Sequence, residues 1–115
     1  MPAVILVVEY EWALRGTLSQ ALRAAGWHVL EAGSGEAAIG LLYACMKPIS
    51  AVITGIPLKG MLTGWDVAEA VREKHPAAQV IYAAGNSIEC RRQVSGGVFI
   101  EKPYRVPDMV KAVTA

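Results

Sequence analysis

The chain has little of several residue types that mark particular classes of protein. Its 115 residues include two cysteines, and 11 basic residues against 10 acidic ones leave a net charge of +1. This near balance does not indicate a nucleic-acid-binding surface. Cys45 and Cys90 lie far apart in the sequence, which argues against a disulfide framework or a zinc site and suits the reducing cytoplasm.

Long apolar runs are also missing. The run at residues 3–8 is far shorter than the roughly 20 apolar residues that a membrane-spanning helix needs. No basic segment precedes this run, as one would in a secretory signal peptide. We therefore expect a cytoplasmic protein that does not contact a membrane.

Apolar residues are abundant, at 54% of the chain, which is enough to build a packed core. The length fits one domain, and the sequence shows no internal repeat, linker or low-complexity segment. We therefore expect a single domain over residues 1–115.

Strand-like apolar segments alternate with helix-like segments along the chain. The continuous apolar run at residues 3–8 is typical of a strand buried on both faces of a parallel sheet. Apolar residues at steps of three and four predict a helix over residues 11–25, and Gly26 follows it as a C-terminal glycine. The remaining strands are expected at 27–31, 49–54, 79–83 and 97–100, and the remaining helices at 35–45 after a Ser34 cap, at 65–74 and from Pro107 onward.

This alternation predicts a three-layer α/β sandwich around a five-stranded parallel sheet. Residues 86–93 have only a weak helical pattern, so the fourth helix of the series is expected to be short. Sheets of this kind place their sites beyond the carboxyl ends of the strands.

Several segments of the chain, in this order, carry a recognisable pattern. They are Val-Ile-Leu-Val-Val-Glu at 4–9, Gly-Trp-His-Val-Leu-Glu-Ala at 26–32, Ala-Val-Ile-Thr at 51–54, Gly-Trp-Asp-Val-Ala at 64–68, and Lys102-Pro103. With them the chain resembles the flavodoxin-like receiver domain of two-component response regulators over essentially its whole length. The resemblance implies an acid pocket that holds Mg²⁺, and an aspartate at the end of the third strand that accepts a phosphoryl group from a histidine kinase.

Three of the five expected pocket residues depart from this pattern. Glu9 matches the first acid and Lys102 matches the lysine, but Tyr10 stands where the second acid is expected. Gly55 stands in place of the phosphoacceptor aspartate, and Ala84 in place of the Ser or Thr. Because glycine has no nucleophile, position 55 cannot form an acyl phosphate.

The charges that remain in this pocket sum to zero. We expect Glu9 and Lys102 to pair directly, which leaves little reason to bind a divalent cation, so Mg²⁺ binding is expected to be lost or weak and no other cofactor is predicted. The Tyr10 hydroxyl could occupy part of the vacated space and form a hydrogen bond there.

The resemblance also implies a face that carries the signal to partners. Phe99 stands at the position of the family's rotating aromatic residue, and Tyr104, Val106 and Val110 are expected on or near the same face. An exposed apolar stripe there would favour a homodimer or a dedicated protein partner. The alternative is that these residues only cover the core.

The favoured hypothesis is a degenerate receiver that is not an enzyme and acts through protein contacts without aspartate phosphorylation. Its partner would be a histidine kinase or another regulator, with no direct contact to nucleic acid. One alternative is an ordinary phosphorylatable receiver whose acceptor was lost or mutated in this chain. Another is a small-ligand-binding domain that uses the same crevice.

Overall fold

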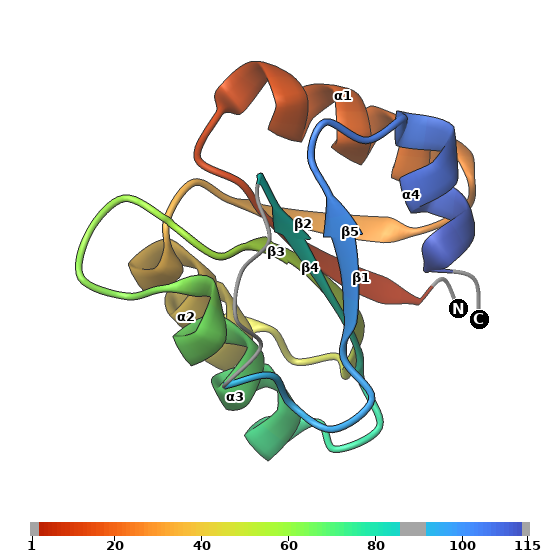
Figure 1. Cartoon of the computed structure of the whole chain (residues 1–115). Helices are drawn as coiled ribbons and strands as arrows, with labels where there is room; N and C mark the ends of the chain where they lie inside the picture. The colour runs from red at the N-terminus through yellow and green to blue at the C-terminus, as the bar shows by residue number, and fades with distance from the viewer. Residues whose placement is uncertain (1–2, 86–91, 114–115) are drawn as a thin grey trace.

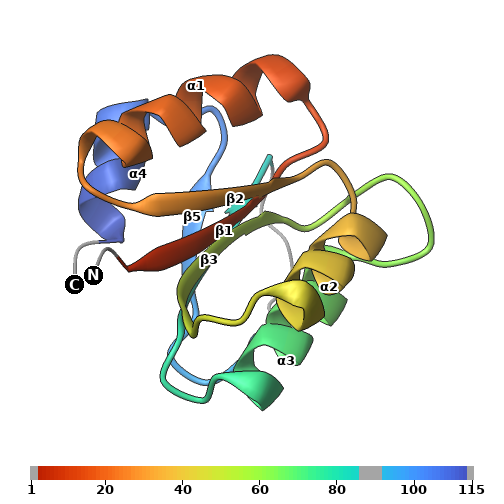
Figure 2. The ribbon, with the colours of Figure 1, turned by 180° about the vertical axis from the view of Figure 1, so that it is seen from behind.

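The described part of the chain, residues 3–85 and 92–113 of a computed structural model, folds as a three-layer α/β sandwich. In chain order its elements are β1 (Val4–Val8), α1 (Trp12–Ala24), β2 (His28–Ala32), α2 (Gly35–Ala44), β3 (Ile49–Gly55), α3 (Gly64–Lys74), β4 (Gln79–Ala84), β5 (Val98–Glu101) and α4 (Val106–Ala112). The strands form one parallel sheet in the order β2-β1-β3-β4-β5. Helices α1 and α4 cover one face of the sheet, and α2 and α3 cover the other (Figure 1 and, from behind, Figure 2).

The predicted fold class is confirmed, and most predicted elements end within a residue or two of the observed ones. The short helix expected at 86–93 falls mainly on residues 86–91, which lie outside the described residues, while Arg92 and Gln93 are not helical. Within the described ranges, no helix combines the length and the apolar character that crossing a membrane requires.

Local signals at the helix ends behave largely as the sequence predicts. The Ser34 hydroxyl accepts a hydrogen bond from the Ala37 backbone N–H at 3.1 Å, which caps α2. Gly26 follows α1 with a φ of 101°, a conformation that favours glycine. Helix α3 begins with a capping box of Thr63 and Asp66 that the sequence reasoning did not predict.

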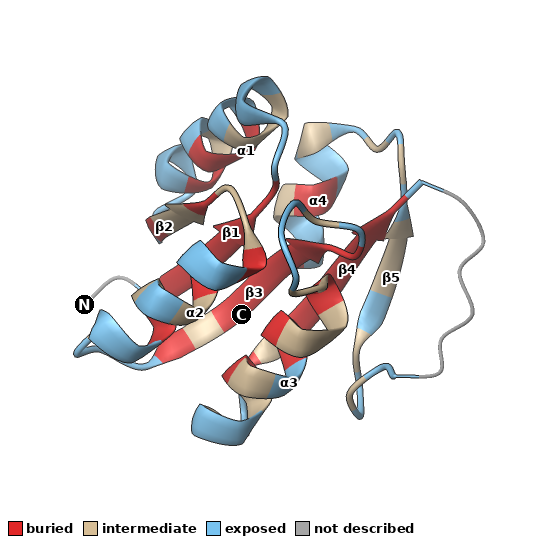
Figure 3. Ribbon diagram, turned by 90° about the vertical axis from the view of Figure 1, so that its left-hand side faces the viewer, coloured by how far each residue is buried: buried red, intermediate tan, exposed pale blue. Residues whose placement is uncertain are grey.

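The core lies on both sides of the three central strands. Strands β1, β3 and β4 are almost entirely buried, whereas the edge strands β2 and β5 are only partly so (Figure 3). One cluster of buried side chains packs under α2 and α3, and a second packs under α1 and α4. Continuous burial explains why β1 is entirely apolar and why β3 and β4 are mostly apolar.

A close backbone approach joins the end of β3 to the start of α3. The Gly64 N–H donates to the Ile56 carbonyl at 2.8 Å. A Cβ atom at Gly64 would lie only 1.9 Å from the Gly55 carbonyl oxygen, and this oxygen belongs to backbone, which has little freedom to move aside. Glycine is therefore required at position 64, next to the carboxyl end of the sheet.

Replacing Gly64 by alanine should therefore destabilise the fold. We expect Gly64→Ala to lower the free energy of unfolding by about 1–3 kcal/mol or more, measured by urea denaturation, because the added methyl group overlaps backbone atoms. The matched control is Gly16→Ala in the middle of α1, where an added Cβ meets no atom within 4 Å. That change should raise stability by about 0.5–1 kcal/mol, and equal effects of the two substitutions would contradict the overlap.

Candidate functional site

A partly buried ion pair lies at the carboxyl end of the sheet. Glu9 directly follows β1 and Lys102 directly follows β5. The Lys102 Nζ lies 2.5 Å from the Glu9 Oε1, and the two side chains are 25% and 5% exposed. The direct pair expected from the charge count is therefore present.

Further hydrogen bonds hold both partners of this pair in place. The Glu11 backbone N–H donates to the second carboxylate oxygen of Glu9 at 3.1 Å, and Arg15 Nη1 donates to the Glu9 carbonyl at 2.7 Å. The Lys102 backbone N–H donates to the Ala84 carbonyl at 2.6 Å, just before the cis peptide bond to Pro103. Each oxygen of the Glu9 carboxylate thus has one donor from the protein itself.

The strands between these two partners end without a chemically active side chain. Gly55 and Ala84 are the buried last residues of β3 and β4. A Cβ atom at Gly55 would have no neighbour closer than 3.5 Å, so the backbone leaves ordinary contact distance for a side chain there. The adjacent Thr54 is fully buried, and its hydroxyl donates to the Gly55 carbonyl at 2.7 Å.

Tyr10 does not fill the pocket in the way the sequence suggested. The residue is 50% exposed, and the Lys59 Nζ lies 5.8 Å from the centre of its ring, within cation–π range. The expected hydrogen bond from its hydroxyl is not made to any residue that the structure describes. Tyr10 therefore lies at the rim of the site rather than inside it.

The residues at this site do not fit the Mg²⁺ ion that the resemblance implies. A hard cation of this kind needs several oxygen ligands, and carboxylates are the strongest of them. Glu9 is the one buried carboxylate among the described residues, and Lys102 already neutralises it. Over residues 3–85 and 92–113, no group of three or more His, Cys, Asp or Glu side chains is placed to hold a metal ion.

Phe99 belongs to a cluster of aromatic rings on the face covered by α2 and α3. Its ring stacks on Tyr82 with centroids 4.8 Å apart, and Trp65 lies 5.8 Å away. The Tyr82 hydroxyl accepts a hydrogen bond from the Val94 backbone N–H at 3.0 Å. Phe99 is half-buried and packs against the core beneath these helices.

The other residues expected on the partner face lie across the sheet from Phe99. Tyr104, Val106 and Val110 are half-buried and pack against the cluster beneath α1 and α4. These side chains and Phe99 therefore do not form one exposed apolar stripe, and their packing agrees with the alternative that they cover the core. Their contact with a partner stays a prediction.

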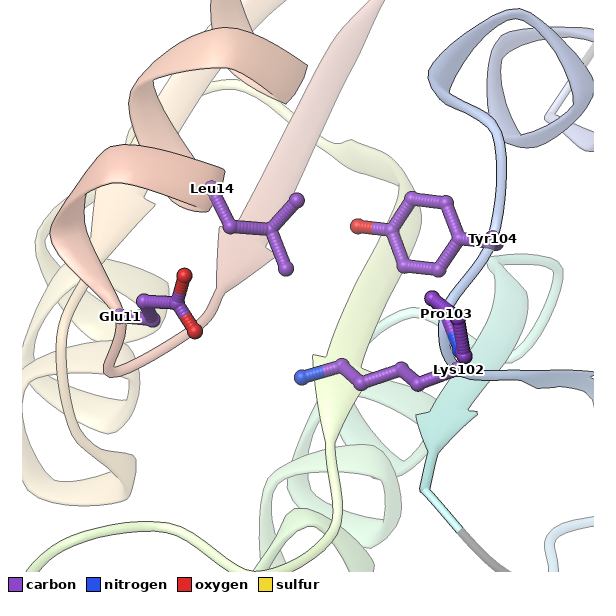
Figure 4. A pocket seen from close by; sticks show the side chains of 5 residues that line it. All are labelled: Glu11, Leu14, Lys102, Pro103 and Tyr104. Atoms are coloured by element: carbon purple, nitrogen blue, oxygen red, sulfur yellow. The ribbon is translucent and has the colours of Figure 1, made fainter.

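A pocket of about 450 Å³ opens between the start of α1 and the segment after β5 (Figure 4). The sequence singled out Lys102 and Tyr104 but did not predict that they would meet side chains of α1, because no local pattern reports how a helix docks. The pocket is lined by Glu11, Leu14, Lys102, Pro103 and Tyr104.

The pKa of Tyr104 reflects the burial and the charges at this pocket. Burial, with a smaller contribution from the negative charges of Glu9 and Glu11, raises the pKa of the Tyr104 phenol to about 12. The phenol therefore stays neutral at physiological pH and can donate a hydrogen bond into the pocket.

Removing the lysine of this ion pair should be costly. Lys102→Met leaves the Glu9 carboxylate buried without a counter-charge, and we expect the free energy of unfolding to fall by about 2–3 kcal/mol, measured by urea denaturation. The double variant Glu9→Gln/Lys102→Met should recover part of this loss, because no unpaired charge remains. The exposed Lys47→Met is the matched control. A Lys102→Met variant as stable as the control would show that the pair contributes nothing.

Comparisons with known proteins agree on the fold. No protein-family model matches the chain. A response regulator receiver protein from Sinorhizobium medicae WSM419 superposes with a TM-score of 0.90 at 28% identity, covering 97% of this chain and 91% of that chain. The receiver domain from the hybrid histidine kinase CckA superposes with a TM-score of 0.82 at 28% identity, covering 96% of this chain and 95% of that one.

A curated relative is similar in sequence. The probable transcriptional regulatory protein TcrX of Mycobacterium tuberculosis (strain ATCC 25618 / H37Rv) is 30% identical over 118 residues, which cover 99% of this chain. The match covers 49% of TcrX, so the chain spans about half the length of this relative.

Proposed function

We propose that this chain, a response regulator receiver domain in fold and sequence likeness, is a protein-interaction module that aspartate phosphorylation does not switch. The observation that carries the proposal is Gly55 at the end of β3, where the family's phosphoacceptor is expected. Glycine has no side-chain carboxylate that could form an acyl phosphate. The neighbouring Thr54 hydroxyl does not replace it, because it is buried and donates to the Gly55 carbonyl.

The charge of the site supports the same proposal. In phosphoryl transfer, a metal ion and a lysine neutralise the charge on the moving group. Here Lys102 is bound to Glu9, and Tyr10 supplies no carboxylate. We therefore propose that Mg²⁺ binding is lost or weak and that the domain catalyses no reaction of its own.

The partner, on this proposal, is another protein of a two-component system. The similar structures include a receiver domain from a hybrid histidine kinase, and the curated relative is described as a probable transcriptional regulator. A histidine kinase, another regulator or a second copy of this chain fits that setting. We propose cytoplasmic binding of such a partner, without direct contact of this domain with nucleic acid or membrane.

A second candidate is an ordinary phosphorylatable receiver whose acceptor was lost or mutated in this chain. The room at Gly55 favours it, since an added Cβ atom meets nothing closer than 3.5 Å. If this second candidate is right, Gly55→Asp together with Tyr10→Asp should restore phosphorylation.

Phosphorylation by a small phosphodonor separates these two candidates. After incubation with acetyl phosphate and Mg²⁺, we expect no phosphoryl adduct on the wild-type chain, measured by intact-mass spectrometry. The Tyr10→Asp/Gly55→Asp variant should also stay unmodified, because Lys102 is held by Glu9 and Ala84 lacks the hydroxyl. An adduct on the wild-type chain would overturn the proposal. An adduct at position 55 of the folded double variant would favour the second candidate.

Magnesium binding gives a test that does not depend on phosphorylation. Trp12 is 76% exposed at the start of α1, three residues after Glu9. Its fluorescence should report Mg²⁺ binding at the Glu9–Lys102 pair. We expect a titration with MgCl₂ into the millimolar range to match a titration with NaCl of equal ionic strength. Saturable binding at submillimolar Mg²⁺ would contradict the proposed loss of the metal site.

A further inference from the structure

The pocket between α1 and the segment after β5 has the size of a small-molecule site. Its volume of about 450 Å³ lies within the roughly 300–1,000 Å³ range of ligand pockets in proteins. It borders the Glu9–Lys102 pair through Lys102, but none of the residues that line it is position 55. The side chains that line the pocket therefore come from α1 and the segment after β5, not from the end of β3.

The lining combines apolar surface with a few polar groups, as ligand pockets do. Leu14, Pro103 and the ring of Tyr104 supply the apolar surface. Figure 4 shows Leu14 and the Tyr104 hydroxyl pointing toward one another across the pocket, and the ends of Glu11 and Lys102 likewise pointing toward one another. A ligand that fits this lining has an apolar body and a polar group at one end.

One negative charge at the pocket is not balanced by the groups around it. Lys102 and Glu9 neutralise each other, whereas the Glu11 carboxylate forms no ion pair within the described residues. The nearby Arg15 donates to the Glu9 carbonyl and pairs with Glu31, 3.5 Å away on β2.

We propose that this pocket binds a small organic cation that carries an ammonium group on an apolar or aromatic body. The ammonium group pairs with Glu11, and the body packs between Leu14 and the Tyr104 ring. An anionic ligand is disfavoured, because the charge of Lys102 is already matched by Glu9 and the Glu11 carboxylate would repel it.

Three probes of nearly equal shape test the charge preference. Phenethylamine is the cation, 2-phenylethanol the neutral analogue and 3-phenylpropionate the anion, each titrated into the ¹⁵N-labelled chain and followed by amide chemical shifts. We expect saturable shifts at Glu11, Leu14, Lys102 and Tyr104, with a dissociation constant on the order of 1 mM for a probe of this size. The amine should bind several-fold more tightly than the alcohol, and the alcohol more tightly than the carboxylate.

Two substitutions separate the charge of the pocket from its apolar surface. Glu11→Gln should abolish the preference for the amine over the alcohol, whereas Leu14→Ala should weaken both. The control Glu73→Gln removes an exposed carboxylate on α3 and should change neither. The amide spectra themselves show whether each variant is folded. The proposal is overturned if the amine gives no saturable shifts, binds no more tightly than the alcohol, or keeps its preference in Glu11→Gln.

Discussion

The burial of the Glu9 carboxylate determines which groups must surround it at the carboxyl end of the sheet. A carboxylate shielded from water needs a counter-charge and hydrogen-bond donors. Lys102, which follows the edge strand β5, supplies the counter-charge. In the sheet, β3 and β4 lie between the strands that carry the two residues. The pair therefore connects segments distant in sequence across two strands that end in Gly55 and Ala84. The same lysine lines the neighbouring pocket, so the pair also determines which charge that pocket presents.

Much of the architecture could be predicted from the sequence, because it follows from local patterns. Continuous apolar runs marked the buried strands, helical spacing marked the faces of the helices, and Ser34 correctly marked the start of α2. Glu9 and Lys102 were expected to pair, because they are the two charges left at the pocket positions of the resemblance and these charges sum to zero. The capping box of Thr63 and Asp66 escaped notice, because it lies at the end of a glycine-rich segment that was interpreted as a loop.

The rest of the site depends on how elements dock, which local patterns do not report. The alternation of side chains along a strand places Phe99 and Ile100 on opposite faces of the sheet, but it does not say which face each of them covers. In the structure Phe99 joins the core beneath α2 and α3, while Tyr104 joins the core on the opposite face. Tyr10 likewise has the size and hydroxyl to fill a pocket, yet it lies at the rim beside Lys59. In each case a tertiary neighbour, not the residue type, determines the position.

The two glycines that lie close together at the end of β3, Gly55 and Gly64, differ in whether the fold requires them. At position 64 the backbone leaves no space for any side chain, so architecture alone is enough to conserve glycine there during evolution. At position 55 the backbone has no positive φ, and a Cβ atom would make only ordinary contacts. Nothing in the scaffold demands glycine at position 55. A descendant of this sequence could therefore acquire a larger residue at position 55 without remodelling the sheet.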